Sequence, residues 1–443
     1  MSSRDVFALR KAGRIAEALA MARRDYAAHP GDPWNVKALA WSLHSAVRTE
    51  ADNGVKMAMA REFMELPLAA DDELLQNVRA GMRRLAEPFT AELQAAREMA
   101  LAGGREQALA RLRNIATAYP GEETVEVALA WELCRDIQQG VKEAQPDGAR
   151  LWGRVEEYMR LDRVPKPSGI HSLFLQWVAV LAKKGAAPRF CEFLQWWDPG
   201  RNLREEDTQG REKEDGGRYD SVVEAAIAGV GKTIEKCIDE GARQTAAGFV
   251  EQHAGRFPAQ EWFPYYRAVC KLATGLEDEA RTLLISIVRA KITESWAWHK
   301  LAACFARGSR EQLQCLCRAA ICPVGGDQYL LGVYAELGSL LLESEHAAEG
   351  RYLLERACAI RMANGWRISA PLQVAMAESE DIVAADSSPL LKEWGTQADE
   401  VLLGDLPWRK AVLSSANVTI EREGQKRAAI CAAWGWRLDL CHP

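Results

Sequence analysis

The stretch AAIAGVGKT at 225–233 is the first candidate for chemistry because it ends in Gly-Lys-Thr. A phosphate-binding loop needs Gly-x-x-x-x-Gly-Lys-Ser/Thr between a buried strand and a helix, so that backbone amides and the lysine can hold phosphates. Gly231, Lys232 and Thr233 supply the end, but Ala226 replaces the leading glycine, and the preceding residues have helical periodicity. We predict a helix whose small residues allow close packing. A nucleotide-dependent enzyme that uses Lys232 is the alternative.

The cysteines are a candidate for metal binding. The chain has 11 of them, scattered and without a Cys-x-x-Cys pair. Cys315, Cys317 and Cys322 lie close together, with His299 and Cys304 upstream. Zinc sites favour cysteine pairs two to four residues apart, whereas Cys-x-Cys on a helix directs its thiols to different faces. We therefore predict reduced, buried thiols and no metal site.

No catalytic arrangement can be singled out. Only 7 histidines are spread over the chain, and none stands in a recognisable Ser-His-Asp or Cys-His arrangement. Acidic residues such as Glu205, Glu206 and Asp207 are interpreted as solvated charge in a loop. The sequence predicts no enzyme and no cofactor.

The composition is that of a folded soluble protein. The 443 residues are 48% hydrophobic and 27% charged, and the formal net charge of -6 gives no general attraction to nucleic acid or anionic membranes. The first residues contain no apolar segment of signal-peptide length, and the longest uncharged apolar stretch, 172–182, is too short to span a bilayer. We expect a cytoplasmic protein.

An internal repeat indicates which elements position these side chains. AGRIAEALAMARRDYAAHPGDPWNVKALAWSL at 12–43 recurs as AGGREQALARLRNIATAYPGEETVEVALAWEL at 102–133, an offset of 90 residues. Each copy predicts a helix, a turn and a second helix, because apolar residues recur at helical spacing and Pro-Gly interrupts them. Asp32 is expected to cap the second helix and Pro33 to occupy its first turn.

The two copies resemble the tetratricopeptide repeat (TPR) family. That family places a glycine five residues before a small residue and a proline twelve residues after it; the next helix carries Leu, a small residue and, three further on, a large residue. The matching residues are Gly13, Ala18, Pro30, Leu39, Ala40 and Leu43, and then Gly103, Ala108, Pro120, Leu129, Ala130 and Leu133.

Two further units extend the resemblance, which covers roughly 1–60, 95–140 and 250–365. In the third unit, Gly275 and Ala280 keep the five-residue spacing, but Ile292 stands where proline is expected. Its second helix carries Trp298, Leu301, Ala302 and Phe305, and a weaker fourth unit runs through Leu337, Gly338, Gly350, Leu354 and Ala357.

The expected fold is all-α: a TPR-like α-solenoid of helical hairpins with a short C-terminal β appendage. Residues 171–197 are predicted to form a helical hairpin broken near 185–188. The expected domains are an N-terminal TPR-like helical lobe at 1–197, a charged flexible loop at 198–219, a C-terminal TPR-like helical lobe at 220–385, a helix and linker at 386–410, and a β-hairpin appendage or truncated OB-like module at 411–443.

Tryptophan supplies the predicted binding site. Of 15 tryptophans, Trp34 and Trp41 fall with Lys37 and His44 on one helical stripe. In TPR arrays the first helix of each pair lines the concave groove, so the resemblance implies that this stripe faces a groove. Residues in like positions on other repeats are Trp131, Trp296 and His299. The alternative is that these tryptophans only pack against the preceding helix pair.

The resemblance therefore implies a non-enzymatic scaffold or adaptor that holds a protein partner in its groove. Some TPR proteins clamp a C-terminal carboxylate with Lys and Asn on this stripe. Lys37 fits such a clamp, but Trp41 replaces the asparagine, so that ligand class is not expected. The layout is also similar to large bacterial TPR proteins of stress-response or phage-conflict systems, some of which end in a barrel-like module.

A nucleic-acid-binding regulator is the other alternative. Residues 411–440 contain alternating and β-branched residues around a Glu-Gly turn, which predicts a β-hairpin and a possible third strand. The nucleic-acid contacts in that case would be Arg422, Lys426, Arg427 and Trp434. The identity of the partner and the oligomeric state are not predicted.

Overall fold

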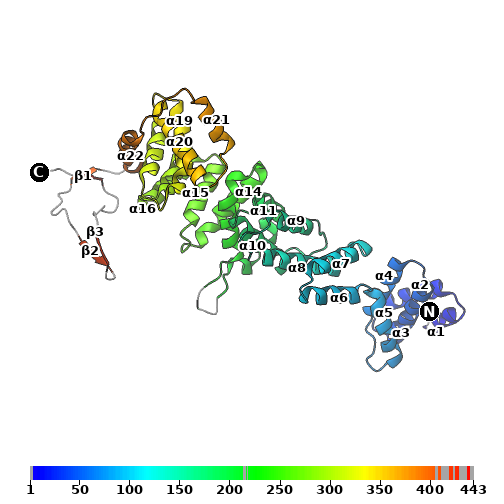
Figure 1. The fold of residues 1–443 in the computed structure, drawn as a ribbon. Coiled ribbons are helices and arrows are strands. Elements are labelled where there is room, and N and C mark those ends of the chain that lie inside the picture. Colours follow the sequence, from blue (N-terminus) through cyan, green and yellow to red (C-terminus); the bar gives the residue numbers. More distant parts are fainter. Residues whose placement is uncertain are drawn as a thin grey trace. The chain divides into compact units, whose positions relative to one another are not determined.

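The protein is described by a computed structural model that covers residues 3–212, 216 and 218–404 and four short strands between 408 and 439 (Figure 1). Up to residue 404 the described chain is all-α, as the sequence predicts, and contains 22 α-helices. None of the helices in this described part is long and apolar enough to cross a membrane.

The chain divides into two compact units. The first comprises Met1–Glu143 with Arg150–Lys166, and the second Ala144–Ala149 with Pro167–Pro443. The predicted boundary loop at 198–219 therefore lies within the second unit.

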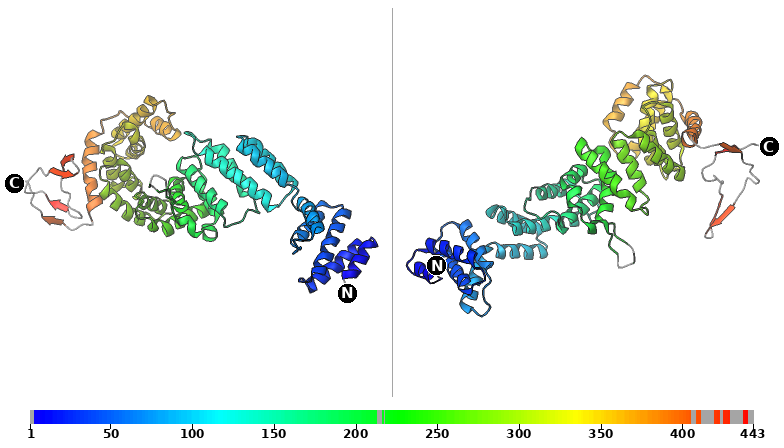
Figure 2. Two further views of the ribbon diagram at one scale, coloured as in Figure 1. Left: turned by 90° about the horizontal axis from the view of Figure 1, so that it is seen from below. Right: turned by 180° about the vertical axis from the view of Figure 1, so that it is seen from behind.

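Helices of the first unit pack against their neighbours in the chain, α1 to α5 in one run and α6 to α8 in the next (Figure 2). Leu39, Leu43 and Phe63 lie in the core shared by the first run. The helices are α1 (Ser3–Lys11), α2 (Ile15–Ala28), α3 (Pro33–Thr49), α4 (Asn53–Met64), α5 (Glu73–Ala86), α6 (Thr90–Leu101), α7 (Arg105–Ala118), α8 (Glu123–Gly140) and most of α9 (Gly148–Met159).

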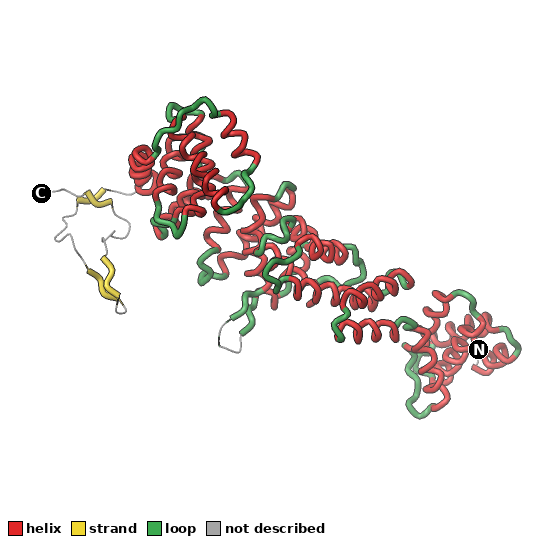
Figure 3. Tube along the Cα trace, viewed as in Figure 1, coloured by secondary structure: helices red, strands yellow, loops and turns green. Residues whose placement is uncertain are grey.

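The second unit is also built of helices joined by loops (Figure 3). It contains thirteen α-helices and four short 3-10 helices, η1 to η4. The first part contains α10 (Gly169–Lys183), α11 (Phe190–Trp197), α12 (Pro199–Asn202), η1 (Glu205–Thr208), α13 (Val222–Thr233), η2 (Ile234–Lys236), α14 (Glu240–His253), η3 (Ala254–Arg256) and α15 (Phe263–Ala273). The rest contains α16 (Glu277–Ala290), α17 (Ser295–Ala302), α18 (Arg310–Ile321), η4 (Asp327–Leu330), α19 (Leu331–Leu342), α20 (Ala347–Ala363), α21 (Ala370–Glu378) and α22 (Ser388–Leu403). The predicted hairpin of 171–197 is confirmed as α10 and α11.

The repeat copies form the predicted helix–turn–helix units, α2–α3 and α7–α8. The glycine that precedes each unit has a left-handed backbone, with φ of 77° at Gly13 and 90° at Gly103. The next amide then reaches back across the turn, from Arg14 to the Leu9 carbonyl and from Gly104 to the Met99 carbonyl, 3.0 Å in each case. This pattern ends the preceding helix because only glycine adopts such a φ without steric cost.

The predicted cap of α3 is also confirmed. The Asp32 carboxylate accepts a hydrogen bond from the Trp34 amide at 2.8 Å, and Pro33 occupies the first turn. In the weaker fourth unit, α19 and α20 cross where Gly338 meets Gly350, since a Cβ added to Gly350 would lie 2.8 Å from the Gly338 carbonyl oxygen.

Asp207 is buried, which corrects our interpretation of this residue as solvated charge, whereas Glu205 and Glu206 are exposed as expected. Asp207 is 1% exposed. It accepts a hydrogen bond from Ser172 of α10 at 2.7 Å and pairs with Arg204 at 2.9 Å. A buried carboxylate needs such partners, and here a helix distant in the sequence supplies one.

The segment 386–410, predicted as a helix and linker, contains the helix α22. α22 packs along α18 and also contacts α16. Leu391, Ala398 and Leu402 are buried there, and Arg289 of α16 donates to the Leu402 carbonyl at 2.7 Å.

Four short strands follow α22. β1 (Trp408–Lys410) pairs in parallel with β4 (Arg437–Asp439), and β2 (Thr419–Arg422) pairs antiparallel with β3 (Gln425–Ala428). The remainder of 405–443 lies outside the described residues, so the β appendage stays a prediction.

Candidate functional site

A groove of about 480 Å³ lies beside α8 in the first unit. Its walls are one face of α6 and one face of α8, because the lining residues recur every three or four positions. Over Thr124–Arg135 this face is about 16 Å long, at about 1.5 Å per residue. The lining comprises Thr90, Leu93, Gln94 and Arg97 of α6, Leu112 of α7, and Thr124, Val127, Ala128, Trp131, Glu132 and Arg135 of α8.

Trp131, one of the predicted site residues, lies in this groove. Its side chain is 36% exposed, and the guanidinium carbon of Arg135 lies 5.6 Å from its ring centre. Leu112 in the same lining is buried, and Val127 and Ala128 are half-buried. The groove therefore has an apolar floor with a tryptophan that can cover an apolar side chain.

The charge along the groove is positive. Its one carboxylate, on Glu132, pairs with Arg135 and lies 3.5 Å from Arg105. Arg97 on the opposite wall is exposed and has no ion-pair partner among the described residues. A bound segment would therefore meet two arginines and a carboxylate that is already neutralised.

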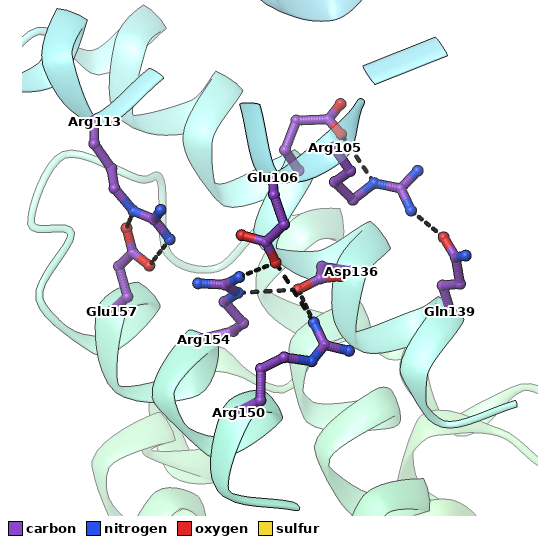
Figure 4. Close-up of polar contacts among 9 residues, drawn as sticks. Arg105, Glu106, Arg113, Asp136, Gln139, Arg150, Arg154 and Glu157 are labelled. Carbon is purple, nitrogen blue, oxygen red and sulfur yellow. Dashed lines mark hydrogen bonds and ion pairs between the residues drawn. The ribbon is translucent and has the colours of Figure 1, made fainter. Parts of the chain in front are cut away.

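A polar network fixes α8 against α7 and α9 (Figure 4). Asp136 of α8 accepts hydrogen bonds from Arg150 at 2.7 Å and Arg154 at 2.9 Å, both on α9. Arg154 also pairs with Glu106 of α7. Because three helices share these paired charges, the helix that carries Trp131 is held rigidly.

A second bridge links α7 to α9. Arg113 and Glu157 form a two-pronged ion pair, with distances of 2.7 and 2.8 Å (Figure 4). Two parallel hydrogen bonds of this kind fix the orientation of both side chains as well as their separation.

The predicted stripe on α3 is divided. Trp34 is 63% exposed, with the Lys37 ammonium 5.9 Å from its ring centre, and Lys37 pairs with Asp72 at the start of α5 at 2.9 Å. Trp41 instead packs against the core of α1–α5, where Arg10 of α1 lies 5.3 Å from its ring centre. Trp41 therefore packs against neighbouring helices, as the alternative interpretation expects.

His44 contacts Trp41 edge-on and lines a separate cleft of about 390 Å³ between α3 and α5. Burial and the positive charges of Arg48 and Arg10 lower the pKa of His44. The imidazole is therefore neutral at pH 7, and the charged side chain in the cleft lining is that of Arg48.

The predicted residues on α17 belong to the second unit. Trp296 is half-buried and lies 5.1 Å from Trp262 and 5.3 Å from Tyr265 of α15, measured between ring centres. His299 hydrogen-bonds to Glu336 of α19 at 2.8 Å. Both residues thus contact side chains of other helices in the second unit, Trp296 at α15 and His299 at α19.

The Gly-Lys-Thr stretch forms the last turn of α13. A Cβ added to Gly231 would lie 2.2 Å from Tyr266, and one added to Gly229 would lie 2.8 Å from Phe190. Thr233 is buried and donates to the Gly229 carbonyl at 2.9 Å. The prediction of a helix with small residues for close packing is confirmed, and this geometry is not that of a phosphate loop.

The clustered cysteines are buried in and beside α18. Cys315 and Cys317 have no exposed surface, and burial raises the pKa of Cys317 to about 12. Within the described ranges no group of three or more His, Cys, Asp or Glu side chains could hold a metal ion.

The predicted nucleic-acid contacts stay predictions. Arg422, Lys426 and Arg427 belong to β2 and β3, but their side chains lie outside the described residues, as does Trp434 altogether.

The sequence analysis missed the second wall of the groove and the partners of Trp296. Leu93 and Arg97 precede the repeat motif, and Trp262 precedes the third unit. No identical residue recurs at the 90-residue offset upstream of the motif, so only the helix bounds show that α6 stands where α1 stands in the first copy.

One family comparison gives a match. Residues 261–397 match a family described as a domain of unknown function (DUF7017). The match begins beside Trp262, includes Trp296 and His299, and ends in α22. It does not extend into the first unit. No curated protein matches the chain.

Proposed function

We propose that the chain is a non-enzymatic scaffold built as a TPR-like solenoid, and that the groove between α6 and α8 binds a segment of a protein partner. The observation that carries this proposal is Trp131, which is exposed in a groove at the position that the repeat resemblance assigns to partner binding. Interface centres are enriched in tryptophan and arginine.

The side chains that line the groove favour a partner segment that is acidic and carries a large apolar side chain. The apolar residue would lie on Trp131 and Leu112, and acidic residues would pair with Arg97 and Arg135. A helix of about three turns matches the length of the lined face, and helix-in-groove binding uses such i, i+3 and i+4 anchors. The resemblance to bacterial TPR proteins of stress and phage-conflict systems supports a cytoplasmic role in a system of that kind.

Binding of defined peptides tests this proposal. Amphipathic peptides of about 12 residues, at about 1.5 Å per residue, span the groove as helices. Acidic, neutral and basic versions would be compared by fluorescence anisotropy. We expect the acidic set to bind, with affinity that falls as salt is added. Trp131→Ala should weaken binding by about 30-fold or more, the loss typical of a central aromatic anchor.

Two matched controls accompany this test. Trp366→Ala removes a tryptophan of the second unit that is 45% exposed, and it should leave the peptide affinity unchanged. Arg97→Glu should reverse the charge preference, whereas Arg24→Glu on α2 should not. Equal binding by the parent, Trp131→Ala and Arg97→Glu would refute the assignment of the groove.

A further inference from the structure

A second cleft lies within the second unit, between the segment 198–208 and α14. Its volume is about 550 Å³, more than a single phosphate group would fill. The side chains that matter here are Asp198, Arg204, Glu205, Thr245, His253 and Arg256. None of them belongs to the groove of the first unit.

His253 is a buried side chain in the cleft lining, and one of its ring nitrogens lacks a hydrogen-bond partner. It is 4% exposed, and its Nδ1 atom has no hydrogen-bond partner in the described structure. The ring of Phe249 packs against it with ring centres 4.8 Å apart. A buried polar atom left unpaired lowers stability, so such an atom beside a cleft points to a ligand or ordered water.

The charge beside His253 is positive. Burial, and then the charge of Arg256, lower the pKa of this imidazole. Arg256 is exposed and has no ion-pair partner among the described residues. An anion bound here would offset the repulsion between Arg256 and protonated His253, and it would accept hydrogen bonds from both.

The lining holds two carboxylates and two arginines, so the positive charge is local to Arg256 and His253. Asp198 lies 3.4 Å from Arg201, so its charge is partly neutralised. Glu205 is exposed. The charge that lowers the pKa of His253, after burial, is that of Arg256.

Arg204 is positioned on the other wall. Its Nε donates to Ser172 at 3.1 Å and its Nη2 to Asp207 at 2.9 Å, which leaves Nη1 without a hydrogen bond among the described residues. The Arg204 guanidinium is therefore oriented before any ligand binds, and little rotamer entropy would be lost on binding.

The turn at Asp198 keeps this wall in a fixed geometry. Asp198 has a positive φ of 54°. No other non-glycine residue in the described part of the chain has a positive φ. The Trp197 indole donates to the His171 carbonyl at 2.9 Å and stacks on the His171 ring at 4.8 Å. These contacts stabilise an unfavourable backbone conformation at the edge of the cleft.

We propose that this cleft binds a small organic molecule through a phosphate group, which His253, Arg256 and Arg204 contact. Thr245 and the remaining volume of the cleft would take the organic part. This proposal does not depend on the function proposed for the first unit.

Histidine signals in the full chain provide the test. The protein has 7 histidines, so selective ¹³C labelling of histidine gives few signals, and His253→Gln identifies one of them. Inorganic phosphate and ribose 5-phosphate would be titrated separately, with calorimetry in parallel. We expect both to shift the His253 signal and raise its titration midpoint, and ribose 5-phosphate to bind more tightly.

Variants separate this site from other anion sites. Arg256→Gln, which alters an exposed side chain, should weaken binding about tenfold, the effect of losing one charge-assisted hydrogen bond. Arg367→Gln, another exposed arginine of the second unit, should have no effect. The proposal is overturned if neither compound moves the His253 signal, or if Arg256→Gln binds like the parent. A response to inorganic phosphate alone would limit the ligand to the free anion and reject the organic part.

Discussion

At the scale of residues, two substitutions between the repeat copies explain why one tryptophan is covered and the other is open. Trp41 and Trp131 occupy the same repeat position, 90 residues apart. In the first copy, Arg10 of α1 lies over both Phe7 and Trp41. The second copy has Arg97 and Ala100 at the positions of Phe7 and Arg10. The smaller alanine and the exposed Arg97 leave the Trp131 face accessible.

Close packing of single residues also determines the role of the Gly-Lys-Thr stretch. We predict that Gly231→Ala lowers the stability of the second unit by about 1–3 kcal/mol, the usual cost of overpacking, because the added Cβ would overlap the Tyr266 ring. Gly248→Ala on α14 is the matched control, since nothing lies within 4 Å of its added Cβ. That substitution should stabilise by about 0.5–1 kcal/mol through helix propensity. Urea unfolding measures both, and an unchanged or raised midpoint for Gly231→Ala would contradict the close packing of α13.

At the scale of elements, the sequence predicted those helices whose ends carry a local signal. Gly13 and Gly103 stop helices through their own backbone, and Asp32 caps α3 through its own side chain. Such contacts lie within a few residues of each other, so one sequence is enough to find them.

Elements fixed by distant contacts were not predicted. The sequence alone predicts Asp207 to be a solvated loop residue. Only the structure shows that Ser172 and Arg204 hydrogen-bond to it. The groove needs α6 as well as α8, and α6 carries no repeat motif of its own. Helical periodicity places Trp34 and Trp41 on one stripe, but it does not show that Arg10 covers only the second.

The docked helix α22 yields a prediction at this scale. Leu390, Leu391 and Leu402 are buried where α22 packs, and each buried leucine contributes about 1.5–3 kcal/mol. A chain that ends at residue 385 should therefore lose several kcal/mol of stability and expose the apolar face of α18. A chain that ends at residue 404 keeps α22 and is the control. Thermal unfolding and dye binding to exposed apolar surface measure the difference, and equal behaviour of the two chains would show that α22 is dispensable.

At the scale of the whole molecule, the division into two units has an energetic consequence. The core of α1–α5 and the core around α16–α20 share no residues, and they lie in different units. A cavity in one core is therefore expected to destabilise only the unit that contains it.

Two leucine truncations test this independence by calorimetry. Leu39→Ala in the first unit and Leu316→Ala in the second each remove a side chain that is at most 1% exposed, at a cost of about 2–5 kcal/mol. Two transitions are expected, and each variant should lower the midpoint of one of them. The free energies should add within about 0.5 kcal/mol in the double variant, because the sites share no partners. A single transition that both variants lower equally would show that the units unfold together, and binding to the groove would then also depend on the second unit.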